Sequence, residues 1–227
     1  MNNIFREETI LSLIVLLTAA VSPNIWPAAS AGYGGMPFLM KWLLIPSIII
    51  MLIVFGMAWL RHHNQLFHRM IVGGGVGLIA TIGLEIIRQI GFHQGWMPGD
   101  MPKLLGVLIT NRFMLGPSTL SNILGYAYHF WNGICFGLIF TIIAGRKPFY
   151  WGIFYALLIG TGFLLSPPVQ SMGIGFMGTG LPGMIETVYV AHLAYGSILG
   201  YLDHKWLRQA GWLFSQPDNR ALEIDKI

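Results

Sequence analysis

The chain has 227 residues, of which 55% are hydrophobic and only 10% are charged. Soluble domains carry about 25% charged residues, so this composition excludes an ordinary water-soluble core and predicts a protein that lies in a bilayer. The formal charge of +4 does not indicate a nucleic-acid partner, because the basic residues stand near the ends of apolar segments, where membrane topology accounts for them. The one cysteine, Cys135, excludes a disulfide within the chain.

Six apolar segments each have close to the ~20 residues that a helix needs to cross a bilayer. We therefore predict an all-α polytopic membrane bundle formed by residues 1–204, with a cytoplasmic tail at 205–227. The predicted spans are 9–27, 37–60, 69–92, 120–144, 148–166 and 184–204.

The first of these segments has features of a cleaved signal peptide. Arg6 precedes the apolar run 10–21, and the sequence Ala-Ser-Ala at 29–31 resembles a cleavage site. However, Glu7 and Glu8 interrupt the positive region that such a peptide requires. We interpret the segment as a retained first membrane helix, which carries Pro23 and Pro27 at its end.

The distribution of Lys and Arg predicts that both termini face the cytoplasm, since cytoplasmic loops carry the excess of these residues. With that orientation the inner side holds Arg6, Arg61, Arg69, Arg146, Lys147, Lys205, Arg208, Arg220 and Lys226, and the outer side holds Lys41, Arg88, Lys103 and Arg112. His62, His63 and His68 fall in an inner loop, where we expect solvation or contact with lipid headgroups.

Two outer segments are expected to be more than connectors. In 93–120, Asp100 can cap a short helix whose first turn contains Pro102. In 166–183, glycines and prolines alternate quickly with polar residues, which predicts irregular structure.

One motif occurs twice, with a separation of 63 positions. Because a helix returns to the same face every three or four residues, each copy places a ring, an imidazole and two glycines in one stripe. Glycines in such a stripe favour close contact between membrane helices. The copies read Tyr126-x-x-His129-x-x-Asn132-Gly133-x-x-x-Gly137 and Tyr189-x-x-His192-x-x-Tyr195-Gly196-x-x-x-Gly200.

The third span has a related stripe at a spacing of four, formed by Gly73, Gly77, Thr81, Glu85 and Gln89. His129 and His192 each lie about eight residues from the outer end of their spans, or roughly 12 Å at 1.5 Å per residue. Glu85 reaches a similar depth. We therefore expect spans three, four and six to converge, with Glu85, Arg88, His129 and His192 among them, and with Asp100 and Glu186 nearby.

Four roles for this cluster remain open from the sequence. It can be a structural polar cluster without a ligand, in which Glu85 and Arg88 neutralise each other. It can be a metal site formed by His129, His192, Glu85 and Glu186. It can ligate haem b through the two histidines, although glycines on the same face leave little room for a porphyrin. It can also carry protons or a small solute, with histidine as the titrating group.

The C-terminal half resembles the small inner-membrane proteins of the YagU type, a family of unassigned biochemical activity. Three elements carry the resemblance: the run HFWNGICFGLIF at 129–140, the basic turn at 143–148 followed by Trp151-Gly152, and Glu186 ahead of His192. The last two residues are separated by five positions here, whereas the family has three. The resemblance covers about 100–202 and implies a polytopic inner-membrane protein, but no reaction.

We predict an integral membrane subunit or binding protein rather than an enzyme, because no nucleophile–base pair or cofactor fingerprint is present. The sequence leaves the cofactor of the cluster undetermined, with a metal ion as the first candidate and haem b as the second. The expected partners are the lipid bilayer and other membrane subunits or copies of the same chain. The expected location is a bacterial-type inner membrane.

Overall fold

The computed structural model describes residues 2–207 and residue 211, and its regular elements are helices. In chain order they are α1 (Asn2–Ser30), α2 (Met36–Leu39), η1 (Met40–Leu44), α3 (Ile45–Leu60), α4 (Asn64–His93), α5 (Met101–Ile109), α6 (Thr119–Ile143), α7 (Tyr150–Leu165), α8 (Pro167–Ser171), η2 (Phe176–Gly178) and α9 (Met184–Trp206). The all-α prediction is confirmed. The predicted tail at 205–227 lies for the most part outside the described residues.

Within the described residues, five helical segments are long and apolar enough to cross a membrane, and they correspond to the first five predicted spans. Their bounds are Glu7–Ser30, Met36–Leu60, Asn64–His93, Thr119–Ile143 and Tyr150–Ser171. The sixth predicted span corresponds to α9, which has 23 residues but carries Glu186, Asp203 and Lys205 and is not among the five. The fold is therefore that of a multi-pass membrane protein with five clear spans.

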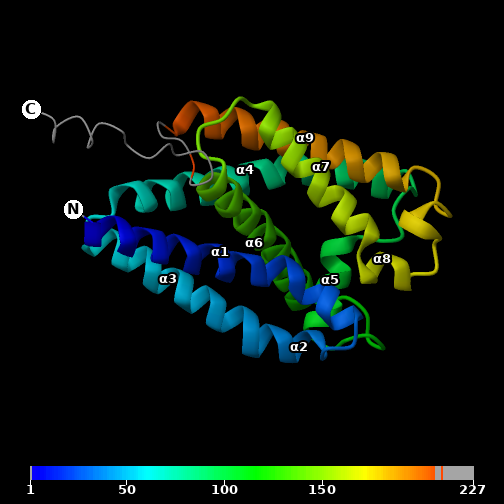
Figure 1. Cartoon of the computed structure of the whole chain (residues 1–227). Coiled ribbons are helices and arrows are strands. Elements are labelled where there is room, and N and C mark those ends of the chain that lie inside the picture. Colours follow the sequence, from blue (N-terminus) through cyan, green and yellow to red (C-terminus); the bar gives the residue numbers. More distant parts are fainter. Residues whose placement is uncertain (1, 208–210, 212–227) are drawn as a thin grey trace, which may run out of the picture.

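The long helices form one bundle. Figure 1 shows α1 and α3 on one side, α7 and α9 on the opposite side, and α6 running obliquely between them. α4 packs extensively against both α6 and α9, α7 packs against α9, and α1 packs against α6 and α3. Of the three helices expected to converge, α4 is thus the common neighbour of the other two.

The glycines of the first motif copy lie where α6 meets α4. A Cβ atom added to Gly137 would lie 2.7 Å from Cα of Gly77, and one added to Gly73 would lie 3.0 Å from the carbonyl oxygen of Gly137. Real Cβ atoms do not approach other atoms so closely, so side chains here would push the helices apart. The absence of side chains therefore sets the distance between α4 and α6.

The glycines of the second copy lie where α9 meets α7. A Cβ atom on Gly196 would lie 2.6 Å from the carbonyl oxygen of Gly152, and one on Gly152 would lie 2.6 Å from Cα of Gly200. The backbone of Phe149 approaches Gly200 as well. The two copies therefore occupy equivalent places in two different helix pairs.

At one end of the bundle the first turns of α1 contact the connection between α3 and α4. Glu7 pairs with Arg61, and Oε1 of Glu8 accepts a hydrogen bond of 2.9 Å from the backbone amide of Leu66 in the first turn of α4. His63 is only 2% exposed and lies 3.6 Å from the Glu7 carboxylate. The expectation that His63 is solvated is wrong, because two distant glutamates enclose it.

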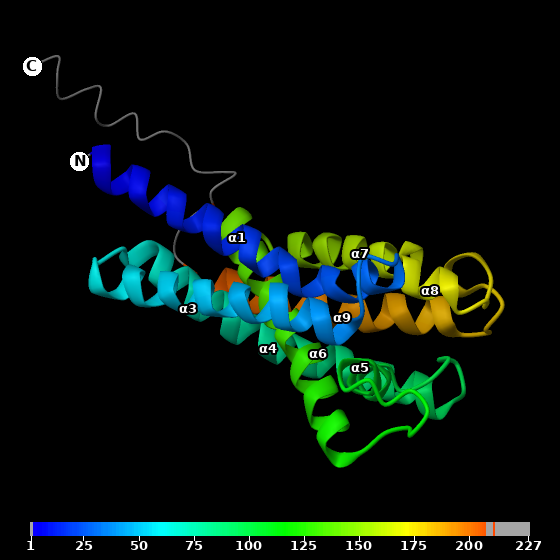
Figure 2. The ribbon, with the colours of Figure 1, turned by 90° about the horizontal axis from the view of Figure 1, so that it is seen from below.

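At the opposite end, α5 and the loops around it project from the bundle together with the first turns of α6 (Figure 2). α5 begins directly after Asp100, as predicted, but the side chain of Asp100 makes no capping hydrogen bond. Within 166–183, expected to be irregular, the structure contains α8 and η2. α8 starts with Pro167 and Pro168, which are compatible with a first helical turn.

Candidate functional site

A polar network joins α4, α5 and α6 near this end of the bundle. Nε and Nη2 of Arg88 donate to the two carboxylate oxygens of Glu85 at 2.8 and 2.6 Å, and Nη2 also donates to Oδ1 of Asp100 at 3.0 Å. On the other side, Nε2 of His129 lies 3.2 Å from Oε2 of Glu85. The sequence analysis expected Glu85, Arg88, His129 and His192 to lie together. The first three meet here with Asp100, whereas His192 takes no part in these contacts.

Three further contacts extend the network to its rim. Nε2 of Gln89 donates to the hydroxyl of Tyr126 at 2.8 Å, and that hydroxyl donates to Asp100 at 3.4 Å. Nζ of Lys103 lies 3.1 Å from Oδ2 of Asp100. Asp100 thus neutralises two cations instead of capping α5. Because a buried charge is costly unless it is paired, this pairing explains how Arg88 can be only 4% exposed.

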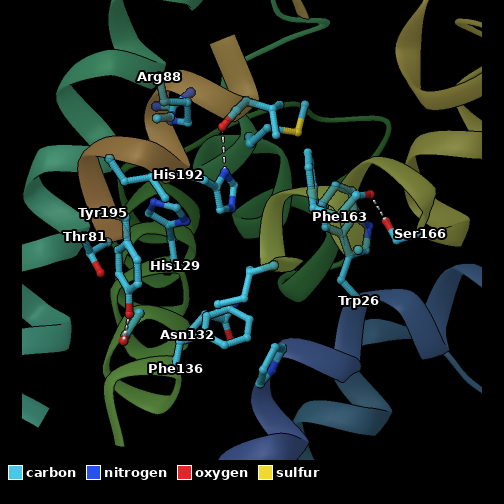
Figure 3. Close-up of a pocket in the computed structure, with 18 of the residues that line it drawn as sticks. Trp26, Thr81, Arg88, His129, Asn132, Phe136, Phe163, Ser166, His192 and Tyr195 are labelled. Atoms are coloured by element: carbon cyan, nitrogen blue, oxygen red, sulfur yellow. Dashed lines mark hydrogen bonds between the residues drawn. The ribbon is translucent and has the colours of Figure 1, made fainter. Parts of the chain in front are cut away.

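Next to the network lies a cavity of about 440 Å³. Apolar side chains from α1, α4, α5, α6, α7 and α9 make up most of its wall. Figure 3 shows Trp26 and Phe163 on one side of the cavity and Arg88, Thr81 and Tyr195 on the other. Its volume and its few convergent polar groups are those of a small-molecule site.

Both motif histidines line this cavity, but they are held differently. His129 contacts the carboxylate of Glu85. Nδ1 of His192 instead donates to the carbonyl oxygen of Val188 in its own helix at 2.8 Å. This bond fixes Nδ1 as the protonated nitrogen of neutral His192, so Nε2 is the nitrogen that can accept a hydrogen bond within the cavity.

The other predicted site residues are divided between the network, the cavity and elsewhere. Asn132 lines the cavity and accepts a hydrogen bond of 2.5 Å from Ser22. The hydroxyl of Tyr189 lies 3.1 Å from the hydroxyl of Thr161 instead. Glu186 is exposed in the first turn of α9. In residues 2–207 and 211 no group of three or more His, Cys, Asp or Glu residues is placed to hold a metal ion.

Sequence reasoning missed a second buried carboxylate, Asp203, which is 1% exposed near the end of α9. Oγ1 of Thr141 donates to its Oδ1 at 2.8 Å. It also missed the contacts of α1 with α6, where the hydroxyl of Tyr128 donates to the carbonyl of Ser22 at 2.7 Å. The period-four spacing of Gly133, Gly137 and Thr141 was the one signal that placed Thr141 on a contact face.

The fold and the site define the class: a multi-pass helical membrane protein that encloses a largely apolar cavity beside a charge-compensated polar network. Comparison with protein-family models, curated proteins and solved structures gives no match for this chain.

Proposed function

We propose that this chain is an integral membrane binding protein that takes up a small, mostly apolar molecule in the cavity between its helices. The cavity of about 440 Å³ is the observation that carries the proposal. Solid packing is the norm in protein interiors, where voids larger than a water molecule are few. The neighbouring network of Glu85, Arg88, Asp100 and His129 supports the wall, since it joins α4, α5 and α6.

The proposal includes a six-span topology in which α9 is the sixth membrane helix. Its 23 residues extend for about 35 Å at 1.5 Å per residue, which suffices for the hydrocarbon core. Three contacts support a common end for α4, α6, α7 and α9: His68 with the carbonyl of Trp206, Thr141 with Asp203, and His204 with the carbonyl of Lys147. The basic residues Arg61, Arg69, Arg146, Lys147 and Lys205 lie near that end, which supports its cytoplasmic placement.

Topology can be tested with single cysteines at two exposed positions that flank α9, Pro182 and Lys205. If α9 spans the membrane, a membrane-impermeant maleimide labels the two variants from opposite sides of sealed vesicles. Labelling of both from one side would contradict the six-span topology. Cys135 does not interfere, because it is fully buried.

Binding can be tested by mass spectrometry of organic extracts of the protein purified in a mild detergent. Gly162 lines the cavity, and a Cβ atom at this position meets nothing within 4 Å. Gly162→Trp therefore fills part of the cavity without a direct clash at Cβ. Gly75→Trp is the matched control, since Gly75 also has open space but does not line the cavity. We expect a copurifying lipophilic molecule with wild type and Gly75→Trp, and its loss from Gly162→Trp. Extracts that do not differ would overturn the proposal.

A further inference from the structure

The cavity reaches the surface of the bundle on one side. Of the described residues that line it, Asn24 on α1 and Gly162 on α7 are the exposed ones. α1 packs mainly against α3, α6 and α8, and α7 packs mainly against α9 and α8. Between α1 and α7 the rings of Trp26 and Phe163 are in contact, with centroids 6.2 Å apart. The mouth of the cavity therefore lies between α1 and α7.

The positions of Asn24 and Gly162 along their helices indicate where the mouth lies relative to the bilayer. Asn24 lies six residues before the end of α1, and Gly162 lies three residues before the end of α7. At 1.5 Å per residue these offsets correspond to roughly 9 and 5 Å along the helices. Both residues lie within segments that are apolar and long enough to span a membrane. A molecule that passes the mouth comes from the lipid phase and not from water.

Two buried nitrogens in the cavity wall make no hydrogen bond to the described residues: Nε2 of His129, which lies 3.2 Å from the carboxylate of Glu85, and a stronger donor, Nη1 of Arg88. Nη1 of Arg88 is buried and makes no hydrogen bond to the described residues, whereas Nε and Nη2 of the same side chain are bonded to Glu85 and Asp100. A buried donor without a partner is destabilising, because it has lost its hydrogen bonds to water and gained none in return. A ligand that brings an acceptor oxygen to Nη1 of Arg88 would remove this destabilisation.

The charge around Arg88 specifies the kind of acceptor. Arg88 and Lys103 contribute two positive charges, and Glu85 and Asp100 contribute two negative charges. These four charges sum to zero, so they balance one another without a ligand. An anionic headgroup would add an unpaired charge next to two carboxylates, which is costly in a low-dielectric site. A neutral carbonyl oxygen accepts the hydrogen bond without that cost.

We infer that the ligand of this cavity is a neutral lipid or lipid-like molecule that passes from the bilayer between α1 and α7 and places a carbonyl oxygen against the guanidinium of Arg88. The inference rests on the proposed binding function and adds the chemical class, the orientation and the route. Ester carbonyls of a diacylglycerol and ring carbonyls of a quinone share this chemistry.

Three probes separate these sources from an anion: a decyl-substituted benzoquinone, dioleoylglycerol, and oleate at a pH where it is ionised. We expect at least one neutral probe to bind the detergent-solubilised wild type at least tenfold more tightly than oleate. Whichever neutral probe binds identifies the source of the carbonyl. Equal or tighter binding of oleate would overturn the inference.

The contact with Arg88 is tested by Arg88→Lys, which retains the charge that Glu85 and Asp100 require but lacks the planar fork of donors. We expect the bound neutral probe to weaken about tenfold or more, as for the loss of a hydrogen bond to a charged group, and the thermal unfolding midpoint to stay close to that of wild type. Unchanged affinity in this variant would overturn the contact. If Arg88→Lys unfolds, the same question is answered in wild type by the infrared carbonyl band of the bound neutral probe, which a hydrogen bond to the guanidinium shifts to lower frequency; an unshifted band would overturn the contact.

The route is tested with Gly162→Cys and Gly75→Cys in lipid nanodiscs. A bilayer-soluble N-alkyl maleimide should label both, and the bound neutral probe should slow the labelling of Gly162→Cys severalfold without affecting Gly75→Cys. Equal effects on both positions would overturn the route.

A molecule that copurifies with wild type but not with Gly162→Trp, together with no binding of either neutral probe, would refute the carbonyl-lipid class and leave the binding function standing. The absence of any copurifying molecule and of any probe binding would refute both.

Discussion

In the motif copy on α6, His129 contacts the carboxylate of Glu85 on α4, whereas in the copy on α9, His192 is bonded to a carbonyl of its own helix. The glycines of the two copies behave alike, since each pair lies against the backbone of a neighbouring helix. The shared spacing therefore determines helix contact in both places. The role of each imidazole depends instead on the residues of the neighbouring helix. Beside His129 on α6, the neighbouring helix α4 places Glu85.

The largest effect on stability is expected when the equivalent glycines of the two motif copies are replaced, as in Gly137→Leu on α6 and Gly200→Leu on α9. Both changes place a side chain where backbone atoms lie within about 3 Å of the new Cβ: Cα of Gly77 at 2.7 Å in the first case and the carbonyl carbon of Phe149 at 2.9 Å in the second. We expect losses of roughly 3 kcal/mol or more in the free energy of unfolding, since overpacking usually costs 1–3 kcal/mol and backbone cannot move aside easily. Reversible unfolding in mixed micelles measures this. Gly75→Leu is the control, and a similar loss there would contradict the explanation.

The next largest effect on stability is expected for His129→Ala, which tests whether the two motif histidines have different roles. The change removes one partner of the buried Glu85 carboxylate, which keeps Arg88 and Gln89. We expect a loss of about 1–2 kcal/mol in the free energy of unfolding. His129→Gln should restore part of it, because the amide can donate to the carboxylate. A loss below about 0.3 kcal/mol would show that the contact of 3.2 Å has no energetic weight.

A smaller effect is expected for Tyr195→Phe, at the position where the copies differ in sequence. The hydroxyl of Tyr195 donates to the carbonyl oxygen of Gly133 at 2.8 Å and so joins α9 to α6. Its removal leaves a buried acceptor with one partner fewer and should cost about 1 kcal/mol in the free energy of unfolding. Tyr189→Phe, at a half-buried hydroxyl near Thr161, is the comparison and should cost less. The reverse order would contradict the bridging role of Tyr195.

The smallest effect on stability is expected for His192→Phe, since the only hydrogen bond that this substitution removes runs to a carbonyl of the same helix turn. The unfolding free energy should change by no more than about 0.5 kcal/mol, because the ring of phenylalanine fills similar space. Retention of the copurifying molecule should fall all the same, since His192 lines the cavity. Equal losses of stability for His129→Ala and His192→Phe would remove the distinction between the two copies.

The apolar runs of about 20 residues were sufficient to predict the first five membrane helices, because length and hydropathy alone decide whether a helix can cross a bilayer. α9 was harder to identify as a span, since Glu186 and Asp203 lower its hydropathy. The short helix α8 was missed because its two prolines predict a break in a helix interior but are favourable in a first turn.

The candidate site was predictable where its members follow helical spacing and not where they meet across the fold. Glu85 and Arg88 are three residues apart, so their contact is local. Equal depth in the bilayer then placed His129 near them. The burial of His63 could not be foreseen, since its partners Glu7 and Glu8 lie more than fifty positions away in sequence. The same holds for the hydrogen bond between Ser22 and Asn132.

The route between α1 and α7 has a mechanical consequence. Gly73, Gly77, Gly133 and Gly137 fix the distance between α4 and α6, and Gly152, Gly196 and Gly200 fix that between α7 and α9. None of these contacts runs between α1 and α7. At that flank the contact is made by side chains instead, the rings of Trp26 and Phe163, whose centroids are 6.2 Å apart. Side chains can change rotamer without moving a helix, so guests of different girth can be accommodated here at a lower energetic cost than at the glycine contacts.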